Sequence, residues 1–172
     1  DYARLKVVYD KGGIYLDTDV ELLKKPDFLL ENQCYIGIQQ PEFLCTTGLG
    51  FGAQKSSPVV QKMMECYDSI SFTDQKKSTF ACPWLNDKVI RSFGKVSNED
   101  ITYLKEVTVY PPRFFDPLST GNTKNLLCDE TVSIHHYAAT WAGNKQRWKR
   151  KLIRFFGEDR YFKLKKLFRR VQ

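Results

Sequence analysis

Two aspartates, Asp17 and Asp19, are the residues of this sequence best suited to carry chemistry. They directly follow the short apolar stretch Ile14-Tyr15-Leu16. An apolar strand that ends in two carboxylates presents them at an edge of a sheet, where α/β proteins usually bind ligands. Hard divalent cations prefer such oxygen ligands. The alternative is a pair of solvated loop acids, because a D-x-D string occurs by chance in about one chain in two or three of this length.

Three metal chemistries compete for this motif. A helix-loop-helix calcium site requires glycine at the sixth loop position, which is Leu22 here, so we exclude it. A phosphoaspartyl-type phosphotransferase would use Asp17 as the nucleophile on phosphorus and Asp19 as the acid, but Glu21 stands where that class usually has Thr or Val. The third chemistry is sugar transfer from a nucleotide diphosphate, in which carboxylate-bound Mn²⁺ or Mg²⁺ neutralises charge on the leaving group.

The elements around the motif must bring both carboxylates to one edge. Apolar residues recur at helical spacing over Asp1 to Asp10, which predicts a helix that Gly12 and Gly13 end. The strand Ile14 to Leu16 follows, so helix, glycine turn, strand and acidic strand end form an α/β unit. Further along, the pattern predicts helices over 57–69 and 83–93 and strands over 33–39, 107–110 and 131–137.

At this point the sequence resembles a known family. The stretch Asp1-Tyr2-Ala3-Arg4 on the predicted helix, followed by Gly12 to Val20 with its Gly-Gly-x-Tyr-x-Asp-x-Asp pattern, is similar to the signature of the DXD sugar transferases. These include capsular polysaccharide glycosyltransferases and fungal initiating mannosyltransferases, and more distantly the catalytic domain of the large glucosylating toxins. The resemblance continues through Val109-Tyr110-Pro111-Pro112 and ends in the segment Ser133 to Trp141.

The resemblance implies roles for the matching residues. Asp1 binds hydroxyls of the donor sugar, and Arg4 contacts the sugar or the diphosphate, which suits a bidentate guanidinium. Tyr15 lines the donor pocket. Asp17 contacts the ribose or sugar and a metal-bound water, while Asp19 ligates Mn²⁺ or Mg²⁺ directly. The expected catalytic residues are therefore Asp17, Asp19 and Arg4.

The closing segment adds His135, His136 and Trp141. One histidine is expected to complete the metal or diphosphate shell, and Trp141 joins the donor-binding set. Adjacent residues on a strand point to opposite faces, so only one imidazole enters the site, and register favours His135. Both remain metal candidates here, and the alternative is that they are ordinary polar strand residues. The family commonly has Ser before its closing Trp, whereas Thr140 stands in this sequence.

Three further features fall where the family forms its acceptor and sugar pocket. The glycine-rich stretch Thr46 to Gly52 suits backbone that passes close to a ligand, or equally a buried strand in which glycine permits tight packing. Trp84 and Asn86 fall near the acceptor side.

Five cysteines without a C-x-x-C pair predict free thiols rather than a zinc site or a disulfide framework.

Composition and charge divide the chain in two. With 172 residues and 42% hydrophobic residues, it has enough apolar material for a globular core, and no window is apolar enough for a spanning helix. Residues 143–172 hold 12 Lys or Arg and 2 Asp or Glu, whereas the rest holds 15 and 18. This tail is predicted to be a basic amphipathic helical extension that docks on an anionic membrane surface. Packing on the body is an alternative, and no nucleic-acid motif accompanies the charge.

These observations predict an α/β fold, with a GT-A-type Rossmann-like glycosyltransferase domain over 1–142 and the basic tail over 143–172. The expected function is metal-dependent transfer of a sugar from a nucleotide-diphosphate donor to a glycan or lipid-linked glycan acceptor, with retention implied by the resemblance, in surface polysaccharide synthesis. The expected location is cytoplasmic and peripheral on the inner face of the membrane. The alternatives are a phosphoaspartyl-type phosphotransferase and a non-catalytic membrane-surface module.

One departure from the family concerns the region before the Asp-x-x-Arg helix. In the family this helix follows the first nucleotide-binding strands, whereas this sequence begins on the helix. The N-terminal strands are therefore expected to be missing and the chain to be a fragment of a longer protein. By itself such a chain would bind the nucleotide base weakly and expose a sheet edge.

Overall fold

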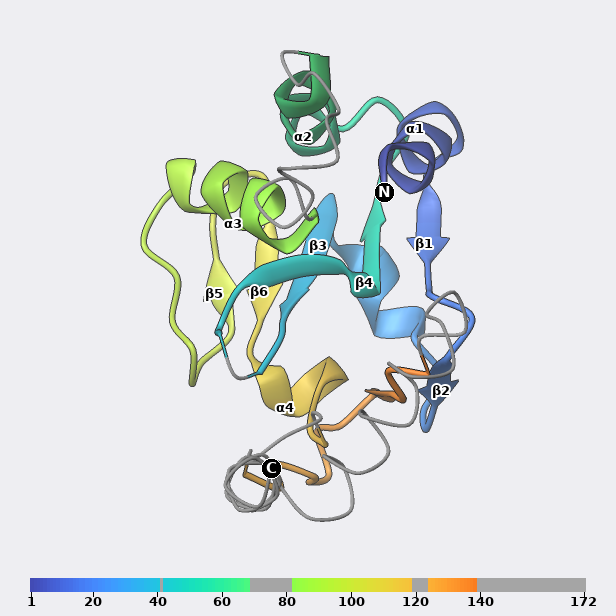
Figure 1. Cartoon of the computed structure of the whole chain (residues 1–172), viewed down its shortest axis with the longest axis vertical. Helices are drawn as coiled ribbons and strands as arrows, with labels where there is room; N and C mark the ends of the chain where they lie inside the picture. The colour runs from blue at the N-terminus through green and yellow to red at the C-terminus, as the bar shows by residue number, and fades with distance from the viewer. Residues whose placement is uncertain (41, 69–81, 119–123, 139–172) are drawn as a thin grey trace, which may run out of the picture.

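The helix that precedes the acidic motif forms as its sequence predicts. The computed structural model describes residues 1–40, 42–68, 82–118 and 124–138 (Figure 1). Helix α1 spans Tyr2–Lys11 and buries Leu5 and Val8. It ends at Gly12, whose φ of 71° lies in the region that favours glycine and whose N–H donates to Val8 O at 2.8 Å. Strand β1, Gly13–Tyr15, follows at once and leads into the two aspartates.

The main sheet is mixed. It contains β1, β3 (Cys34–Ile38), β4 (Cys45–Ala53), β5 (Thr102–Tyr103) and β6 (Thr108–Tyr110) in the order β1-β4-β3-β6-β5. Only β3 and β6 run parallel among the described strands of this sheet. Strand β1 pairs with β4 alone in the described part of the chain. The mixed α/β class is confirmed, while the GT-A-type arrangement stays a prediction.

Two layers of apolar packing enclose the sheet. Alternation along β3 directs Ile36 to one face and Tyr35 to the other. On the Ile36 face, helices α1, α2 (Pro58–Asp68) and α3 (Cys82–Ser92) bury residues such as Val60 and Ile90 in one cluster. On the Tyr35 face, the 3₁₀ helix η1 (Asp27–Glu31) and the short helix α4 (Pro112–Phe115) contribute to a second cluster.

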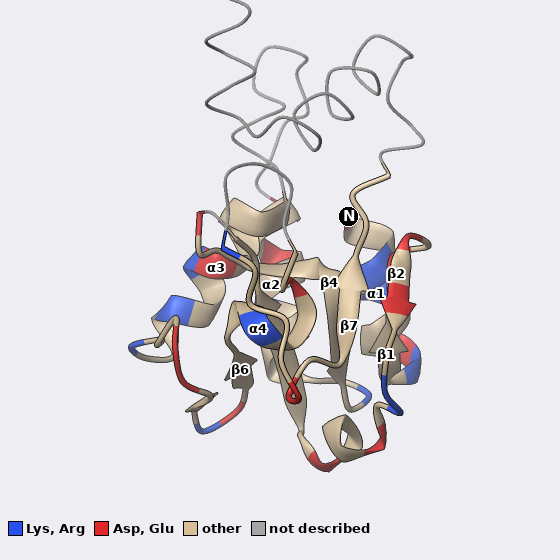
Figure 2. Cartoon of the chain, turned by 90° about the horizontal axis from the view of Figure 1, so that it is seen from below, with Lys and Arg blue, Asp and Glu red and all other residues tan. Residues whose placement is uncertain are grey.

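A second, two-stranded sheet joins distant parts of the chain. Strand β2, Val20–Leu22, pairs antiparallel with β7, Ser133–His135, and Val20 lies opposite His135. The two strands lie side by side in Figure 2. Strand β7 is shorter than the predicted strand over 131–137. This pairing carries the C-terminal histidines to the acidic end of β1.

The sequence pattern did not predict the shortest elements. Strands β2 and β5, helix α4 and η1 contain two to five residues each, too few for a periodic pattern to appear. All five cysteines are free, as predicted. The described residues include no helix that is long and apolar enough to cross a membrane. The predicted basic tail, residues 143–172, lies outside the described residues.

The glycine-rich segment forms β4, and its glycines make room for neighbouring groups. A Cβ at Gly52 would lie 2.5 Å from Cε1 of Tyr35. The Tyr35 ring is 2% exposed and stacks on Phe115, with 5.9 Å between ring centroids, so a shift of the ring would disturb this packing. At this position the tight-packing interpretation of the glycine pattern holds.

We expect Gly52→Ala to destabilise the fold by about 1–3 kcal/mol, the usual cost of overpacking a core. Urea unfolding of the two proteins measures the difference. In a double-mutant cycle with Tyr35→Leu the cost should shrink, because the clash involves the aromatic ring. An equal cost in both backgrounds would show that the ring is not its cause.

Candidate metal centre

Asp17 and Asp19 lie in the turn between β1 and β2. The Val20 N–H donates to Asp17 O at 3.1 Å, which closes the turn. Because β2 pairs with β7, His135 reaches the same place from more than one hundred residues further along the chain. One oxygen from each carboxylate and one ring nitrogen of His135 lie within 4.8 Å of one another. These three residues, Asp17, Asp19 and His135, form the acidic cluster.

The imidazole of His135 is buried in the cluster without a hydrogen bond. Its Nε2 lies 3.2 Å from Oδ1 of Asp19 and 3.7 Å from Oδ2 of Asp17, but neither ring nitrogen makes a hydrogen bond within the described part of the chain. The residue is 9% exposed. A buried polar atom without a partner is costly, and a bound cation would supply one.

The backbone after His135 fixes the orientation of Asp19. The N–H of Ala138 donates to Oδ2 of Asp19 at 2.7 Å, and the N–H of His136 donates to the Asp19 carbonyl at 2.9 Å. With Oδ2 occupied in this way, Oδ1 of Asp19 faces His135. The β7 segment therefore supplies one candidate ligand and holds another in place.

Arg4 and Tyr15 approach the other side of Asp17. Its Oδ1 accepts a hydrogen bond from the Tyr15 hydroxyl at 2.8 Å and lies 3.2 Å from Nη1 of Arg4. The guanidinium also lies 3.2 Å from Asp1 through Nη2 and sits 4.9 Å from the centre of the Tyr15 ring. The structure thus brings Asp1, Arg4, Tyr15 and Asp17 together at the edge of the acidic cluster.

The balance of these contacts lowers the pKa of Asp17. Burial acts to raise it, but the interactions with His135, with the Tyr15 hydroxyl and with the Arg4 charge outweigh burial. The carboxylate form is the one that ligates a cation. Asp17 is therefore held in its ligating form at neutral pH.

We expect Tyr15→Phe to raise the pKa of Asp17, because the change removes the hydroxyl that hydrogen-bonds the ionised form and leaves the ring in place. Carboxyl ¹³C NMR titration of the two proteins measures this pKa. The shift should be absent in Tyr9→Phe, which removes a hydroxyl from the same helix-and-strand unit. An unchanged Asp17 pKa in Tyr15→Phe would contradict the assigned hydrogen bond.

Gly48 of β4 leaves space for the acidic cluster. A Cβ at this position would lie 3.0 Å from Oδ2 of Asp17 and 3.5 Å from Nη1 of Arg4. Within the glycine-rich segment, Gly52 permits packing inside the core, and Gly48 lies beside the candidate site. The acceptor role of this segment stays a prediction.

The remaining predicted residues lie elsewhere. His136 points away from the acidic cluster, and its Nε2 lies 2.8 Å from Oε2 of Glu21. Trp84 is 56% exposed on α3, whereas Asn86 is fully buried and donates to Thr47 Oγ1 at 3.2 Å. Trp141 and Thr140 fall outside the described residues. The expected metal role of His136 thus has no geometric support, while the other assigned roles stay predictions.

Sequence reasoning missed Asp116, at the end of α4. Its side chain is 1% exposed and its Oδ2 accepts hydrogen bonds from the Gln40 N–H and from the Tyr137 hydroxyl. Tyr137 lies two residues beyond His135. The sequence did contain a signal for the burial of Asp116. It directly follows Phe114 and Phe115, and a run of aromatic residues predicts a buried segment.

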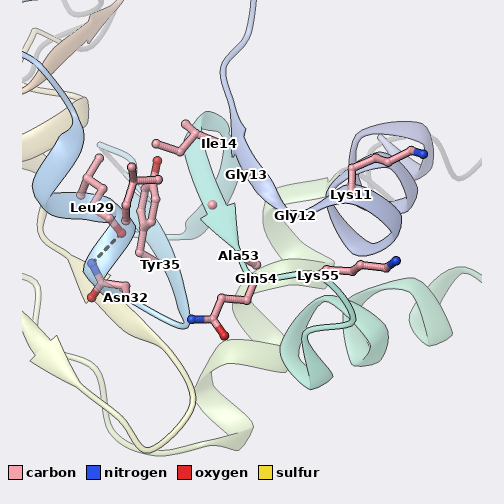
Figure 3. Close-up of a pocket in the computed structure, with 12 residues that line it drawn as sticks. Lys11, Gly12, Gly13, Ile14, Leu29, Asn32, Tyr35, Ala53, Gln54 and Lys55 are labelled. Atoms are coloured by element: carbon pink, nitrogen blue, oxygen red, sulfur yellow. Dashed lines mark hydrogen bonds between the residues drawn. The ribbon is translucent and has the colours of Figure 1, made fainter.

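A cavity of about 290 Å³ lies at the other end of β1 (Figure 3). Its lining includes Gly12, Asn32 and Tyr35 but none of the acidic cluster. In Figure 3 the Lys11 and Lys55 side chains extend away from Tyr35, so their charged ends do not point toward this ring. The cavity is therefore separate from the candidate metal centre.

The donor set of the acidic cluster fits a divalent cation. Two carboxylates and an imidazole suit Mn²⁺, and carboxylates suit Mg²⁺. Neither ring nitrogen of His135 makes a hydrogen bond among the described residues, and Nε2 faces both carboxylates. Asp17, Asp19 and His135 are accordingly the residues that would hold such an ion.

Comparison with known proteins agrees with this chemistry. Residues 1–36 match the family model described as the glycosyltransferase sugar-binding region containing the DXD motif. This segment holds α1, β1 and both aspartates, so the resemblance seen in the sequence is confirmed there, and it indicates a glycosyltransferase. No curated protein and no solved structure gives a significant match to the chain.

Proposed function

We propose that this chain is the catalytic part of a metal-dependent glycosyltransferase that uses a nucleotide-diphosphate sugar. The observation that carries the proposal is the convergence of Asp17, Asp19 and His135, with neither imidazole nitrogen hydrogen-bonded in the described structure. The family match over residues 1–36 supports the reaction class. When bound, Mn²⁺ or Mg²⁺ would neutralise the charge that develops on the diphosphate leaving group.

The protein groups around the acidic cluster have separate tasks in this proposal. Asp19 and His135 hold the ion, with Asp19 oriented by the Ala138 N–H. Asp17 supplies a second carboxylate, whose low pKa keeps it ionised. Arg4 places a positive charge next to Asp17, in position to contact the donor diphosphate or sugar. Tyr15, stacked under the guanidinium, limits the directions in which Arg4 can move.

The proposal extends to the acceptor and the membrane. The acceptor is a glycan or a lipid-linked glycan, and transfer proceeds with retention in surface polysaccharide synthesis. The basic tail, residues 143–172, docks the enzyme on the cytoplasmic face of an anionic membrane, where a lipid-linked acceptor lies. The charge of this tail supports the location.

A phosphoaspartyl-type reaction is less well supported. In that reaction Asp17 would have to attack phosphorus, yet its Oδ1 accepts the Tyr15 hydroxyl and lies 3.2 Å from Arg4. These contacts make Oδ1 a poor nucleophile but leave Oδ2 without either group. The family match over residues 1–36 favours the glycosyltransferase proposal instead.

The proposal is tested by thermal unfolding in the presence of Mn²⁺ and a panel of nucleotide-diphosphate sugars. A ligand at 100 times its dissociation constant should stabilise the native state by about 2.7 kcal/mol. We expect Mn²⁺ to stabilise the protein and one donor sugar to add a further, Mn²⁺-dependent shift. Absence of any Mn²⁺ effect on the unmodified chain would overturn the proposed metal site.

Two adjacent histidines provide a matched pair of variants. His135→Gln removes an imidazole from the acidic cluster, whereas His136→Gln removes one that faces Glu21. The Mn²⁺-dependent shift should be reduced in the first variant and kept in the second. Equal shifts in both variants would place the ion away from His135.

A further inference from the structure

The buried carboxyl of Asp116 anchors two separate parts of the chain. Its Oδ2 accepts the Gln40 N–H at 2.7 Å and the Tyr137 hydroxyl at 2.9 Å, and its backbone carbonyl accepts from Nε2 of Gln40 at 2.8 Å. Gln40 follows the central strand β3, whereas Tyr137 follows β7. Asp116 therefore connects the segment that follows β7 to the segment that follows β3, the strand in the middle of the main sheet.

Tyr137 has a backbone conformation that needs support. Its φ is 50°, which is uncommon for a residue other than glycine and unfavourable for a bulky side chain. The ring contacts His135 edge to face, with 4.2 Å between ring centroids and an interplanar angle of 79°. The hydroxyl is held by Asp116. Contacts at both the ring and the hydroxyl thus fix this residue.

The residue after Tyr137 contacts the acidic cluster directly. Ala138 follows the left-handed conformation of Tyr137 and donates its N–H to Oδ2 of Asp19 at 2.7 Å. At the same time the Tyr137 ring packs against the imidazole of His135. One side chain therefore sets the position of two candidate metal ligands.

We propose that Asp116 and Tyr137 are positioning residues for the metal centre: Asp116 holds the Tyr137 hydroxyl, and Tyr137 in turn orients Asp19 through the Ala138 N–H and His135 through its ring. The inference rests on the metal site of the proposed function. It adds a buried support that runs from α4 and the end of β3 to the acidic cluster. Neither residue is a member of the acidic cluster itself.

The test measures Mn²⁺ affinity by calorimetry and by the loss of the free-ion EPR signal. We expect Tyr137→Phe and Asp116→Ala each to weaken Mn²⁺ binding roughly 10- to 100-fold, the usual effect of removing a group that orients a metal ligand. Asp116→Asn should bind within about threefold of the unmodified protein, because its single amide oxygen can accept both hydrogen bonds. Tyr110→Phe is the matched control, since it removes a hydrogen-bonded hydroxyl from the same apolar cluster.

A second readout needs no metal. In ¹⁵N-labelled protein without Mn²⁺, the Ala138 amide should exchange roughly five- to tenfold faster in Tyr137→Phe, because its hydrogen bond to Asp19 is weakened. Far-UV circular dichroism establishes that each variant is folded. This readout distinguishes the inference from the proposed function: if the unmodified chain bound no Mn²⁺, the metal site would fail, and a faster Ala138 exchange would still support the positioning role.

The inference is overturned by any of three results. Mn²⁺ affinities of Tyr137→Phe and Asp116→Ala equal to that of Tyr110→Phe would show that the two residues only stabilise the fold. An unchanged exchange rate of the Ala138 amide in Tyr137→Phe would show that the hydroxyl does not hold this segment in place. Failure of Asp116→Asn to recover affinity would likewise contradict the assigned hydrogen bond, because this variant keeps the acceptor.

Discussion

Replacing Asp19 with Asn is expected to weaken Mn²⁺ binding by more than about 100-fold, beyond the range seen when only an orienting group is lost. The change removes the negative charge while keeping the size of the side chain and an acceptor for the Ala138 N–H. Donor binding that depends on Mn²⁺ should disappear with it. Calorimetric titration with Mn²⁺, alone and with the nucleotide sugar, measures both effects.

Glu21→Gln is the control for this change. Glu21 lies two residues further along, on β2, and its carboxylate faces His136 instead of the acidic cluster. Glu21→Gln and Asp19→Asn each remove one negative charge from the same turn-and-strand unit. A general electrostatic effect would therefore appear in both variants. Equal affinities of the Asp19 and Glu21 variants would mean that Asp19 is not a ligand.

The second large effect concerns pH and the buried carboxyl of Asp116. Burial raises the pKa of Asp116 to about 7, against the opposing effects of the Gln40 N–H, the Tyr137 hydroxyl and His135, while Glu42 adds to the rise. The unfolded chain ionises this carboxyl near its ordinary pKa of 3.8. The contribution to stability is therefore complete below about pH 4 and is lost as the pH rises through about 7.

A pKa difference of about three units corresponds to about 4 kcal/mol, at about 1.4 kcal/mol for each unit. We expect the unfolding free energy of the unmodified protein to fall by up to this amount, relative to Asp116→Asn, between about pH 4 and pH 8. Urea unfolding of the two proteins at several pH values checks the sign and the size. Parallel stability curves for the two proteins would show that Asp116 is already ionised in the folded state at low pH.

Much of the fold was predictable because local signals were strong. Helix α1 follows from apolar spacing and from Gly12, the residue that tolerates the positive φ at its end. Strands β3 and β6 and helices α2 and α3 also fall within two residues of their predicted ends. Strand β4 was expected only as one of two interpretations of the glycine-rich stretch Thr46 to Gly52. Strands β2 and β5 were not predicted, because their pairing partners stabilise them and their own few residues carry no pattern.

The candidate site likewise contains features that the sequence predicted and features that it left open. The D-x-D at the end of an apolar strand and the Asp-x-x-Arg helix predicted the acidic end of β1, and these residues do lie together. Alternation on a strand predicted that only one of the two adjacent histidines can face the cluster. The sequence favoured His135, and in the structure His135, paired with Val20, is the histidine that faces the cluster.

The sequence by itself determined the order of helix, strand and paired carboxylates, because each of these depends on residues within a few positions of one another. Only the tertiary structure decided that His135 meets Asp19, that Gly48 leaves room for Asp17, and that Asp116 supports Tyr137. These contacts join residues that are far apart in the sequence. Their formation depends on strand register and on the shape of the packed core, which no local pattern encodes.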